Sequence, residues 1–401
     1  MTSARAAAIA SPEAGDRLWT VPYVLALLSA LLFFSAFYLA LAALPKYLKD
    51  QLGTGTGEIG LVLGLFAVTA IAPRPFIGRL VNGGITLAPM LICAVIFMLA
   101  NLFYAGATTI PLLIAVRLFH GGGMAGYTTA APSLVATITP APRRGEAMAY
   151  WGVANTLALA ACPALGLALA GRWGYPACFG VAAVVGAAAV FVTALLRPRN
   201  RPTARPPLPP PGPLLEARVL LPALACFVMM LGYGVIITFI IILADERHIA
   251  GSGFFFTIYA AGLLVARAIA GRLSDRYGRW IVAVPGIACL AISLVVAALA
   301  YGLPLLAVAA LLAGAGFGAA QPALLALTVD LVPHDRRGSA VATYYVAHES
   351  GIATGSIALG WVAQAITTGG MFALTGAALL VAIAALGLHV WRAGQERFAP
   401  V

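Results

Sequence analysis

His348 and Glu349 stand side by side in "ATYYVAHESGIATGS", a stretch whose other residues are uncharged. Removing a carboxylate from water favours its neutral, protonated form, and a histidine titrates near neutral pH. The pair can therefore take up and release protons, or Glu349 can contact a bound substrate. The alternative role is structural, with Glu349 holding a polar group of a neighbouring helix.

Arg117 and His120 form a second candidate pair, in "RLFHGGGMAGY". An arginine keeps its charge in an apolar segment and therefore needs a partner. No carboxylate lies nearby in the sequence, so the partner must come from another helix or from a substrate. The glycines at 121–123 favour close helix packing.

Other chemistry has little support in the sequence. The five histidines are scattered, the five cysteines stand singly without a C-x-x-C pair, and no G-x-x-x-x-G-K-[ST] loop is present. We therefore expect no metal, no cofactor and no use of ATP. A membrane enzyme or receptor is disfavoured, since an enzyme would need its catalytic groups clustered at one membrane face.

The composition indicates a membrane protein. Of the 401 residues, 62% are hydrophobic and 9% are charged, whereas soluble domains carry about 25% charged residues. Apolar stretches of about 18 residues or more recur, long enough to cross a bilayer as helices. We predict an all-α membrane protein with twelve transmembrane helices, at 20–44, 58–77, 86–106, 110–138, 146–170, 175–196, 217–243, 252–273, 280–301, 304–332, 338–366 and 370–391.

A proline- and arginine-rich segment, "RPRNRPTARPPLPPPGP", follows the sixth predicted helix. Proline cannot continue a helix, and the segment is too polar to enter a core, so we interpret it as a linker. The predicted organisation begins with a cytoplasmic N-terminal tail (1–19) and a six-helix bundle (20–196). A cytoplasmic linker (197–216), a second six-helix bundle (217–391) and a cytoplasmic C-terminal tail (392–401) follow.

The positive charges predict the orientation. Seventeen of the 24 lysine and arginine residues fall on the side that holds the termini and the linker, and cytoplasmic loops are enriched in these residues. Both termini are therefore expected in the cytoplasm, in a multi-pass protein of the cell membrane. The net charge of +11 then reflects topology, and no nucleic-acid partner is expected.

The two halves repeat each other at an offset of 193 residues. "APRPFIGRLVN" aligns with "VARAIAGRLSD", which pairs Arg74 with Arg267, and "TPAPRRG" aligns with "VPHDRRG" at the same offset. Such repeats place a binding site near the midplane, at the seam between halves that rock, which disfavours a fixed channel. We expect Arg74 and Arg267 to be gate residues or to extend toward the membrane surface.

"GRLSDRYGRW", at 271–280, resembles the loop signature G-x-L-x-D-R-x-G-R of the major facilitator superfamily. With twelve helices, a central linker and a repeat, the resemblance extends over essentially the whole chain. It implies two pseudo-symmetric six-helix bundles that transport a small molecule by alternating access. The residues expected in a cytoplasmic gate are Gly271, Asp275, Arg276, Gly278, Arg279, Asp330 and Arg337.

The first half departs from this signature. "GRLVNGGITL" has Asn82 where the acid belongs, and Thr137 occupies the position that corresponds to Asp330. One interpretation is an asymmetric gate held mainly by Asp275, Arg276, Asp330 and Arg337. The other is sequence drift in a loop whose packing suffices.

Two further motifs carry the resemblance into the membrane. Arg117 matches the arginine of the superfamily's helix-4 motif R-x-x-Q-G, with His120 in place of glutamine, and this implies a role in proton coupling. The fifth helix keeps Pro163 and Gly166 of the antiporter element G-P-x-x-G-G, but has Cys162 and Leu167 where glycines belong. The second match therefore supports export only weakly.

These observations favour a proton-coupled antiporter that exports small amphipathic molecules, similar to the drug-efflux branch. The alternative is a proton symporter that imports an organic anion anchored by Arg117. Proton coupling is assigned to Glu349, His348 and Arg117. Asn155, the repeat counterpart of His348, is one expected substrate contact. The others are His120, Tyr38, Tyr233, Gln321 and Tyr345. The expected partners are protons, a small-molecule substrate and the lipid bilayer, and we expect a monomer.

Overall fold

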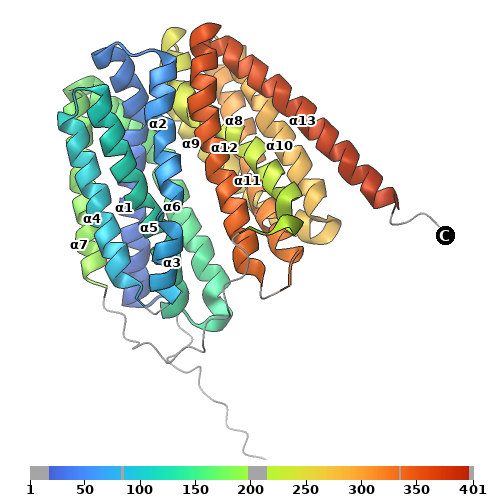
Figure 1. Ribbon diagram of the computed structural model, residues 1–401. Helices are drawn as coiled ribbons and strands as arrows, with labels where there is room; N and C mark the ends of the chain where they lie inside the picture. The colour runs from blue at the N-terminus through green and yellow to red at the C-terminus, as the bar shows by residue number, and fades with distance from the viewer. Residues whose placement is uncertain (1–17, 83–84, 197–214, 334–335, 397–401) are drawn as a thin grey trace, which may run out of the picture.

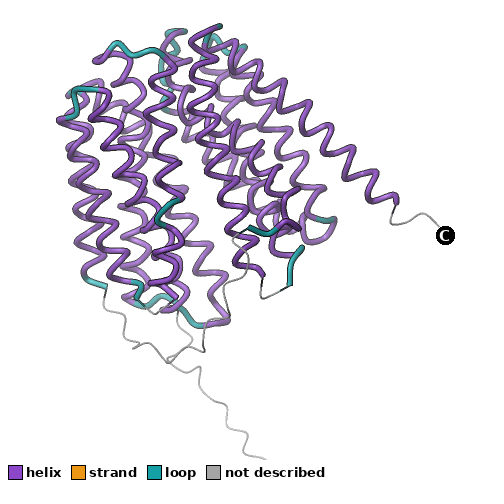
Figure 2. The backbone as a smooth tube through the Cα atoms, viewed as in Figure 1, coloured by secondary structure: helices purple, strands orange, loops and turns teal. Residues whose placement is uncertain are grey.

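The computed structural model describes residues 18–82, 85–196, 215–333 and 336–396 (Figure 1). Most of the predicted N-terminal tail and linker, and the last five residues, lie outside these ranges. Figure 2 shows that the described chain is helical, with short connecting turns. Two short 3₁₀ turns, η1 (Ala141–Arg143) and η2 (Ala217–Val219), precede α6 and α8.

The helices form two groups. The first group comprises α1 (Val21–Leu52), α2 (Thr56–Ile71), α3 (Arg74–Asn82), α4 (Leu87–Gly106), α5 (Ile110–Ile138), α6 (Arg144–Trp173) and α7 (Tyr175–Ala194). The second comprises α8 (Leu220–Glu246), α9 (Phe254–Tyr277), α10 (Arg279–Ala298), α11 (Leu303–Asp330), α12 (Arg337–Ala365) and α13 (Thr368–Glu396).

α2 and α3 form one membrane crossing with a break. Pro73 and Pro75 flank Arg74 at this point, and proline lacks the N–H that a continuous helix needs. Counting α2 and α3 together, the described residues form the twelve predicted crossings. Ten of them are apolar enough to span a membrane by length and composition alone. The remaining two, α5 and α12, contain the ionisable candidates of the sequence analysis.

The positions of the helices reproduce the repeat. α5 and α11 begin at Ile110 and Leu303, and α6 and α12 begin at Arg144 and Arg337, both pairs 193 residues apart. The all-α fold of two pseudo-symmetric six-helix bundles is therefore confirmed. The bundles lie side by side, with the first half in blue and green and the second in yellow and red (Figure 1).

α1 is longer than predicted, because it continues through Pro45 to Leu52. The prediction stopped at residue 44, before the first charges of Lys46 and Lys49. In the helix, Lys46 lies one turn from Asp50 and forms an ion pair of 3.3 Å with it, so these charges are accommodated without ending the helix. Gly53, at a φ of 62°, terminates α1.

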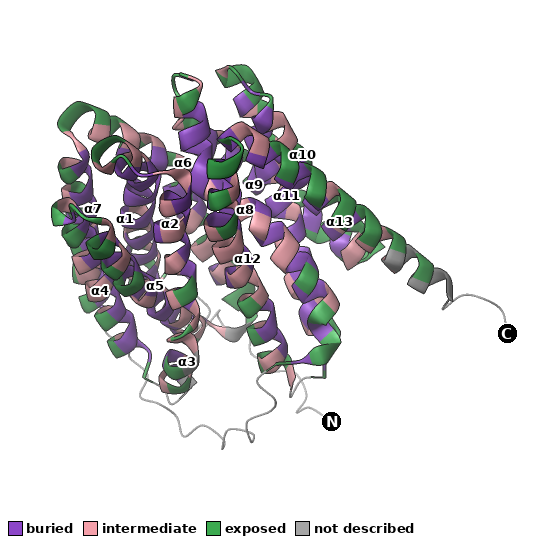
Figure 3. Ribbon diagram, turned by 45° about the horizontal axis from the view of Figure 1, so that its top comes forward, coloured by how far each residue is buried: buried purple, intermediate pink, exposed green. Residues whose placement is uncertain are grey.

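The outer surface of both bundles is apolar. Large hydrophobic side chains such as Val184 and Val381 are about 70% exposed (69% and 71%) and face outward. Figure 3 shows exposed residues on the outer faces and buried residues where helices meet. Inside the first bundle, aromatic rings fill the core, with Phe33 stacked on Tyr127 at a centroid distance of 3.7 Å. An apolar outer surface of this kind is compatible with the hydrocarbon core of a lipid bilayer.

The two bundles meet mainly along α2 and α12, toward one end of the molecule. We call this the far end, because it is opposite the linker end, where α7 finishes and α8 begins. Gly60 packs so closely that a Cβ there would lie 2.2 Å from the carbonyl oxygen of Ser356 and 3.2 Å from the Cα of Gly360. α6 and α9 also meet, but less extensively. Toward the linker end the bundles diverge (Figures 1 and 2).

The Gly60 contact predicts the effect of adding one methyl group. Gly60→Ala cannot keep the observed backbone distance, so we expect the far-end-closed conformation to lose about 1–3 kcal/mol. The equilibrium would shift about 5- to 150-fold toward far-end opening. The measurement is labelling of a cysteine at cavity residue Ile237, in a variant without native cysteines, by an impermeant maleimide added on the far-end side.

Gly180→Ala is the matched control, because no atom lies within 4 Å of a Cβ at Gly180. We expect this variant to label like the parent protein. Equal labelling of the Gly60→Ala variant and the parent would contradict the prediction.

Glu216 attaches the start of the second bundle to α12. Its side chain is 4% exposed, and its carboxylate accepts a hydrogen bond of 3.2 Å from Arg336. Its backbone N–H donates to the hydroxyl of Thr343 at 2.9 Å, and the N–H of Arg218 donates to the carboxylate. The hydrogen bond from Arg336 is the main reason why the pKa of Glu216 lies below its ordinary value of 4.5.

This lowered pKa predicts a pH-dependent contribution to stability. The charged form of Glu216 stabilises the folded protein above about pH 4.5, and the contribution is lost as the pH falls through the lowered pKa. We therefore expect Glu216→Gln to lower the Tm of the purified protein at pH 7, with a difference that shrinks below pH 4.5. A Tm difference that is unchanged at pH 3 would contradict this assignment.

Candidate functional site

A cavity of about 470 Å³ lies between the two bundles. Ligand sites in proteins commonly measure about 300–1,000 Å³. The lining includes side chains from both halves, and eight of the nine predicted proton-coupling and substrate residues belong to it. These eight are Tyr38, Arg117, Asn155, Tyr233, Gln321, Tyr345, His348 and Glu349.

Glu349 forms an ion pair across the seam between the bundles. Its carboxylate, on α12, accepts a hydrogen bond of 3.1 Å from the guanidinium of Arg74, at the start of α3. The side chain of Glu349 is 10% exposed and that of Arg74 is 25% exposed. Arg74 also lies over the ring of Tyr345, 5.3 Å from its centroid. The two halves are thus joined by a charge pair inside the cavity.

His348 lies beside this pair. Its Nδ1 is 3.7 Å from the carboxylate of Glu349, a distance at which the two attract each other when the ring is protonated. Glu349 is the thirteenth residue of α12, about 18 Å from the start of that helix. The carboxylate that can exchange protons therefore lies near the middle of α12, far from the start of the helix.

Arg74 and Arg267 both line the cavity, where we expected gate residues or side chains that extend toward the membrane surface. Arg74 forms an ion pair there with Glu349. Arg74 is the first residue of α3, directly after the break that follows α2. The signal in the sequence was the charge itself, in an apolar stretch and repeated at Arg267.

Two other hydrogen bonds join side chains that line the cavity. Tyr38 of α1 donates a hydrogen bond of 2.9 Å to the side-chain oxygen of Asn155 on α6. Arg267 of α9 donates one of 3.1 Å to the side-chain oxygen of Gln321 on α11. Each contact lies within one bundle, so in these two places the wall belongs to a single half.

Arg117 has backbone partners. It is 3% exposed, and it donates hydrogen bonds to the carbonyl oxygens of Val62 and Leu63 on α2, at 3.3 and 3.1 Å. The Phe66 ring lies 4.5 Å from its guanidinium carbon. These two carbonyl oxygens are the partners that Arg117 needs on another helix, and the hydrogen bonds attach α5 to α2. They leave Arg117 a weaker candidate for the anchor of a substrate anion.

His120 is the predicted substrate residue that does not line the cavity. It is 1% exposed and lies 3.0 Å from the hydroxyl of Tyr104. The rings of Phe66 and Phe97 pack against it, at centroid distances of 5.4 and 4.1 Å. The structure therefore places His120 in the core of the first bundle.

The predicted gate residues lie at the linker end of the second bundle. Arg279, at the start of α10, bonds to Asp275 on α9 and, at 3.0 Å, to Asp330 at the end of α11. Arg276 lies over the ring of Tyr277, and Gly271 is exposed. Gly278 has a φ of 104°, which favours glycine, in the turn between α9 and α10.

Arg279 is thus the centre of this network. The interpretation of an asymmetric gate named mainly Asp275, Arg276, Asp330 and Arg337, and of these the two aspartates bond to Arg279. Arg337 is exposed at the start of α12. Among the described residues, the contacts of this network join helices of one bundle, so they hold that bundle together at the linker end.

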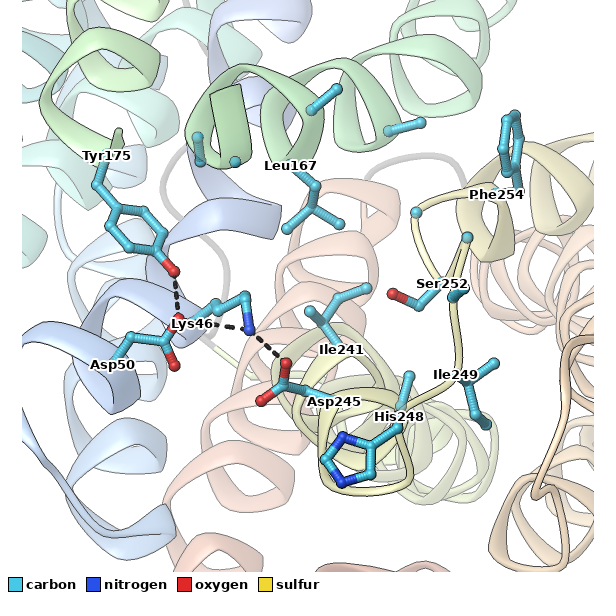
Figure 4. A pocket seen from close by; sticks show the side chains of 18 residues that line it. Lys46, Asp50, Leu167, Tyr175, Ile241, Asp245, His248, Ile249, Ser252 and Phe254 are labelled. Carbon is cyan, nitrogen blue, oxygen red and sulfur yellow. Dashed lines mark hydrogen bonds and ion pairs between the residues drawn. The ribbon is translucent and has the colours of Figure 1, made fainter. Parts of the chain in front are cut away.

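An ion cluster at the far end joins the two bundles. Lys46 of α1 pairs with Asp245 of α8, and Lys49 pairs with the same aspartate at 3.2 Å. Asp50 accepts a hydrogen bond of 2.6 Å from the hydroxyl of Tyr175. Lys46, Asp50, Tyr175 and Asp245 line a hollow of about 680 Å³, and Figure 4 shows their side chains. No pattern in the sequence predicted this contact between Lys46, Lys49 and Asp245.

We expect the cluster to hold the far end closed. Asp245→Asn removes the charge that both lysines share, and exposed ion pairs contribute about 0.2–1 kcal/mol each. For the two pairs together, the far-end-open population should rise about two- to thirtyfold. Spin labels at Gln51 and Ala250, both exposed at the far end, would report the change as a longer distance.

Asp50→Asn serves as the control, because Asp50 bonds within the first bundle to Lys46 and Tyr175. It should change the distance distribution less than Asp245→Asn. Equal distributions for the two variants would argue against an ion pair that closes the far end.

Comparison with known proteins supplies the family context. The model of the Major Facilitator Superfamily matches residues 25–223 and again residues 222–400. The uncharacterized MFS-type transporter YhhS of Escherichia coli K12 is 28% identical over 321 residues, which cover 77% of each chain. A chloramphenicol resistance protein of Streptomyces lividans is 29% identical over 257 residues, 61% of this chain and 65% of that one.

The fold has counterparts among solved structures. The crystal structure of the nucleoside transporter NupG superposes with a TM-score of 0.74 and 17% identity, over 92% of this chain and 99% of that one. At this identity the likeness concerns the fold, and it extends over both bundles.

Proposed function

We propose that this chain, which belongs to the major facilitator superfamily and is therefore a membrane transporter, is a proton-coupled antiporter. It exports small amphipathic molecules. In this proposal the linker end, which carries most of the arginines, faces the cytoplasm. The protein resides in the cytoplasmic membrane with both termini inside.

The ion pair between Arg74 and Glu349 is the observation that carries the proposal. It connects the two halves that must move against each other, and one partner is a carboxylate. A proton on Glu349 removes the attraction and leaves Arg74 uncompensated, which costs on the order of 3 kcal/mol for a buried pair. Protonation therefore changes the relative stability of the conformations, as coupling requires.

His348 supports this role by its position. At 3.7 Å from Glu349, and on the cavity lining, it can pass a proton between the carboxylate and the cavity. Arg117 acts indirectly in this mechanism, by attaching α5 to α2. The bundles are closed at the far end and diverge at the linker end, so this conformation would receive substrate from the cytoplasm.

The cavity lining supports an amphipathic substrate. Phe34, Phe37 and Phe317 provide apolar surface, and the Tyr38–Asn155 pair provides hydrogen-bonding groups. The relative from Streptomyces lividans is named for chloramphenicol resistance. Chloramphenicol therefore belongs in the first panel of test compounds, beside neutral, cationic and anionic amphipathic molecules.

Glu349→Gln tests the coupling. In proteoliposomes with an acidic lumen, we expect the wild-type protein to accumulate substrate in the lumen as protons leave. The variant should lose this accumulation by tenfold or more, because its side chain cannot bind and release a proton, while substrate exchange without a gradient persists. Glu146→Gln, in an exposed pair with Arg143, is the matched control and should transport normally.

Each result has a clear meaning. Unchanged gradient-driven accumulation by Glu349→Gln would remove this residue from coupling. Accumulation only when the outside is acidic would replace antiport with the alternative, a proton symporter that imports an organic anion.

A further inference from the structure

The cavity contains more positive than negative charge. Arg74, Arg117 and Arg267 line it, and Glu349 is the carboxylate among its described lining residues. Glu349 compensates Arg74, and two backbone carbonyl oxygens of α2 accept from Arg117. Arg267 has only the neutral oxygen of Gln321 as a described hydrogen-bond partner, and its buried Nε has none. An arginine charge in this position calls for an anion.

The repeat shows which groups are missing beside Arg267. Arg74 and Arg267 are equivalent positions, 193 residues apart. Arg74 bonds to Glu349 and lies over Tyr345. The counterparts of these two residues in the first half are Thr156 and Gly152.

At these two positions the first half therefore offers Arg267 neither a carboxylate nor an aromatic ring. A Cβ on Gly152 would lie 3.9 Å from a terminal nitrogen of Arg267, so this backbone does face the arginine. The hydroxyl of Thr156 donates to the carbonyl oxygen of Gly152 in its own helix, at 2.9 Å. Arg74 therefore has a carboxylate partner, whereas its repeat counterpart Arg267 has a neutral one, Gln321.

Other donors line the same cavity without partners. The hydroxyl of Tyr259, a residue that is 2% exposed, and the indole N–H of Trp151 have no hydrogen-bond partner among the described residues. A guanidinium and an indole N–H only donate hydrogen bonds, and a tyrosine hydroxyl can donate one. An anion with several acceptor lone pairs is the ligand that satisfies this set.

We propose that the substrate is an amphipathic organic anion whose carboxylate, or a similar acidic group, docks at Arg267 in place of the missing acid. This inference rests on the proposed transport function and names its substrate class. The aromatic side chains Phe317 and Tyr233 line the same cavity and offer a surface for the apolar part. The proton then binds at Glu349, beside Arg74, and the anion binds at Arg267, the repeat counterpart of Arg74.

The test compares carboxylates with their neutral amides. The probes are 4-phenylbutyrate, octanoate and further aryl and alkyl carboxylates, each paired with its amide, and binding to the purified full-length protein is measured at equilibrium. We expect the wild-type protein to bind at least one carboxylate about tenfold or more tightly than its amide, since hydrogen bonds to charged groups are stronger. Arg267→Gln should remove this preference, and Arg267→Lys should keep part of it.

A second variant tests the symmetry argument directly. Thr156→Glu supplies the acid that the repeat lacks, so it should pair with Arg267 and abolish carboxylate binding while amide binding remains. Thr156→Gln is its uncharged control and should retain the carboxylate preference. Circular dichroism and the Tm show whether each variant is folded.

The outcomes separate this inference from the proposed function. No carboxylate preference in the wild-type protein, or a preference that survives in Arg267→Gln, would overturn the anion site even if proton-driven export of neutral compounds persists. Arg267-dependent binding of chloride or phosphate without any carboxylate would assign the site to an inorganic anion and overturn it too. Carboxylate binding that depends on Arg267, together with carboxylate transport that never responds to a pH gradient, would refute antiport and leave the anion site standing.

Discussion

Every charge inside the membrane must find a compensating partner, and this requirement organises the interior of the protein. A charged side chain at the centre of a bilayer is costly unless it is paired or meets backbone carbonyls. Arg117 uses the second solution, with the carbonyl oxygens of α2, and Arg74 uses the first, with Glu349. Because Arg74 and Glu349 belong to different bundles, their compensation depends on how the bundles are arranged.

Close helix packing determines that arrangement. Membrane helices gain little from hydrophobic burial against one another, so small residues that let backbones approach are important. Gly60 and Gly360 allow α2 and α12 to touch at the far end, where Lys46 and Lys49 also reach Asp245. At the linker end, the network around Arg279 holds the helices of the second bundle to one another. The contacts between bundles are thus concentrated at one end.

The two halves share a fold but have diverged in charge. The second half contains the carboxylate of the cavity and the acids of the linker-end network, and the first half has Thr156, Asn82 and Thr137 at the corresponding positions. A symmetric pair of ion pairs would cancel the charge of the cavity. The unequal repeat instead leaves one arginine, Arg267, for a ligand, so the divergence that spares the fold can create the specificity of the site.

The amino-acid sequence was sufficient to predict the class, the twelve crossings and the repeat, because hydrophobic length and a constant offset are local or periodic properties of the chain. It also singled out Glu349, His348 and Arg117, since a charge in an apolar stretch is visible without a structure. The partners of these residues could be identified only once the helices were placed in three dimensions. Arg74 and Glu349 are 275 residues apart in the chain, and their contact depends on the break between α2 and α3 and on the closure of two bundles, which no local pattern encodes.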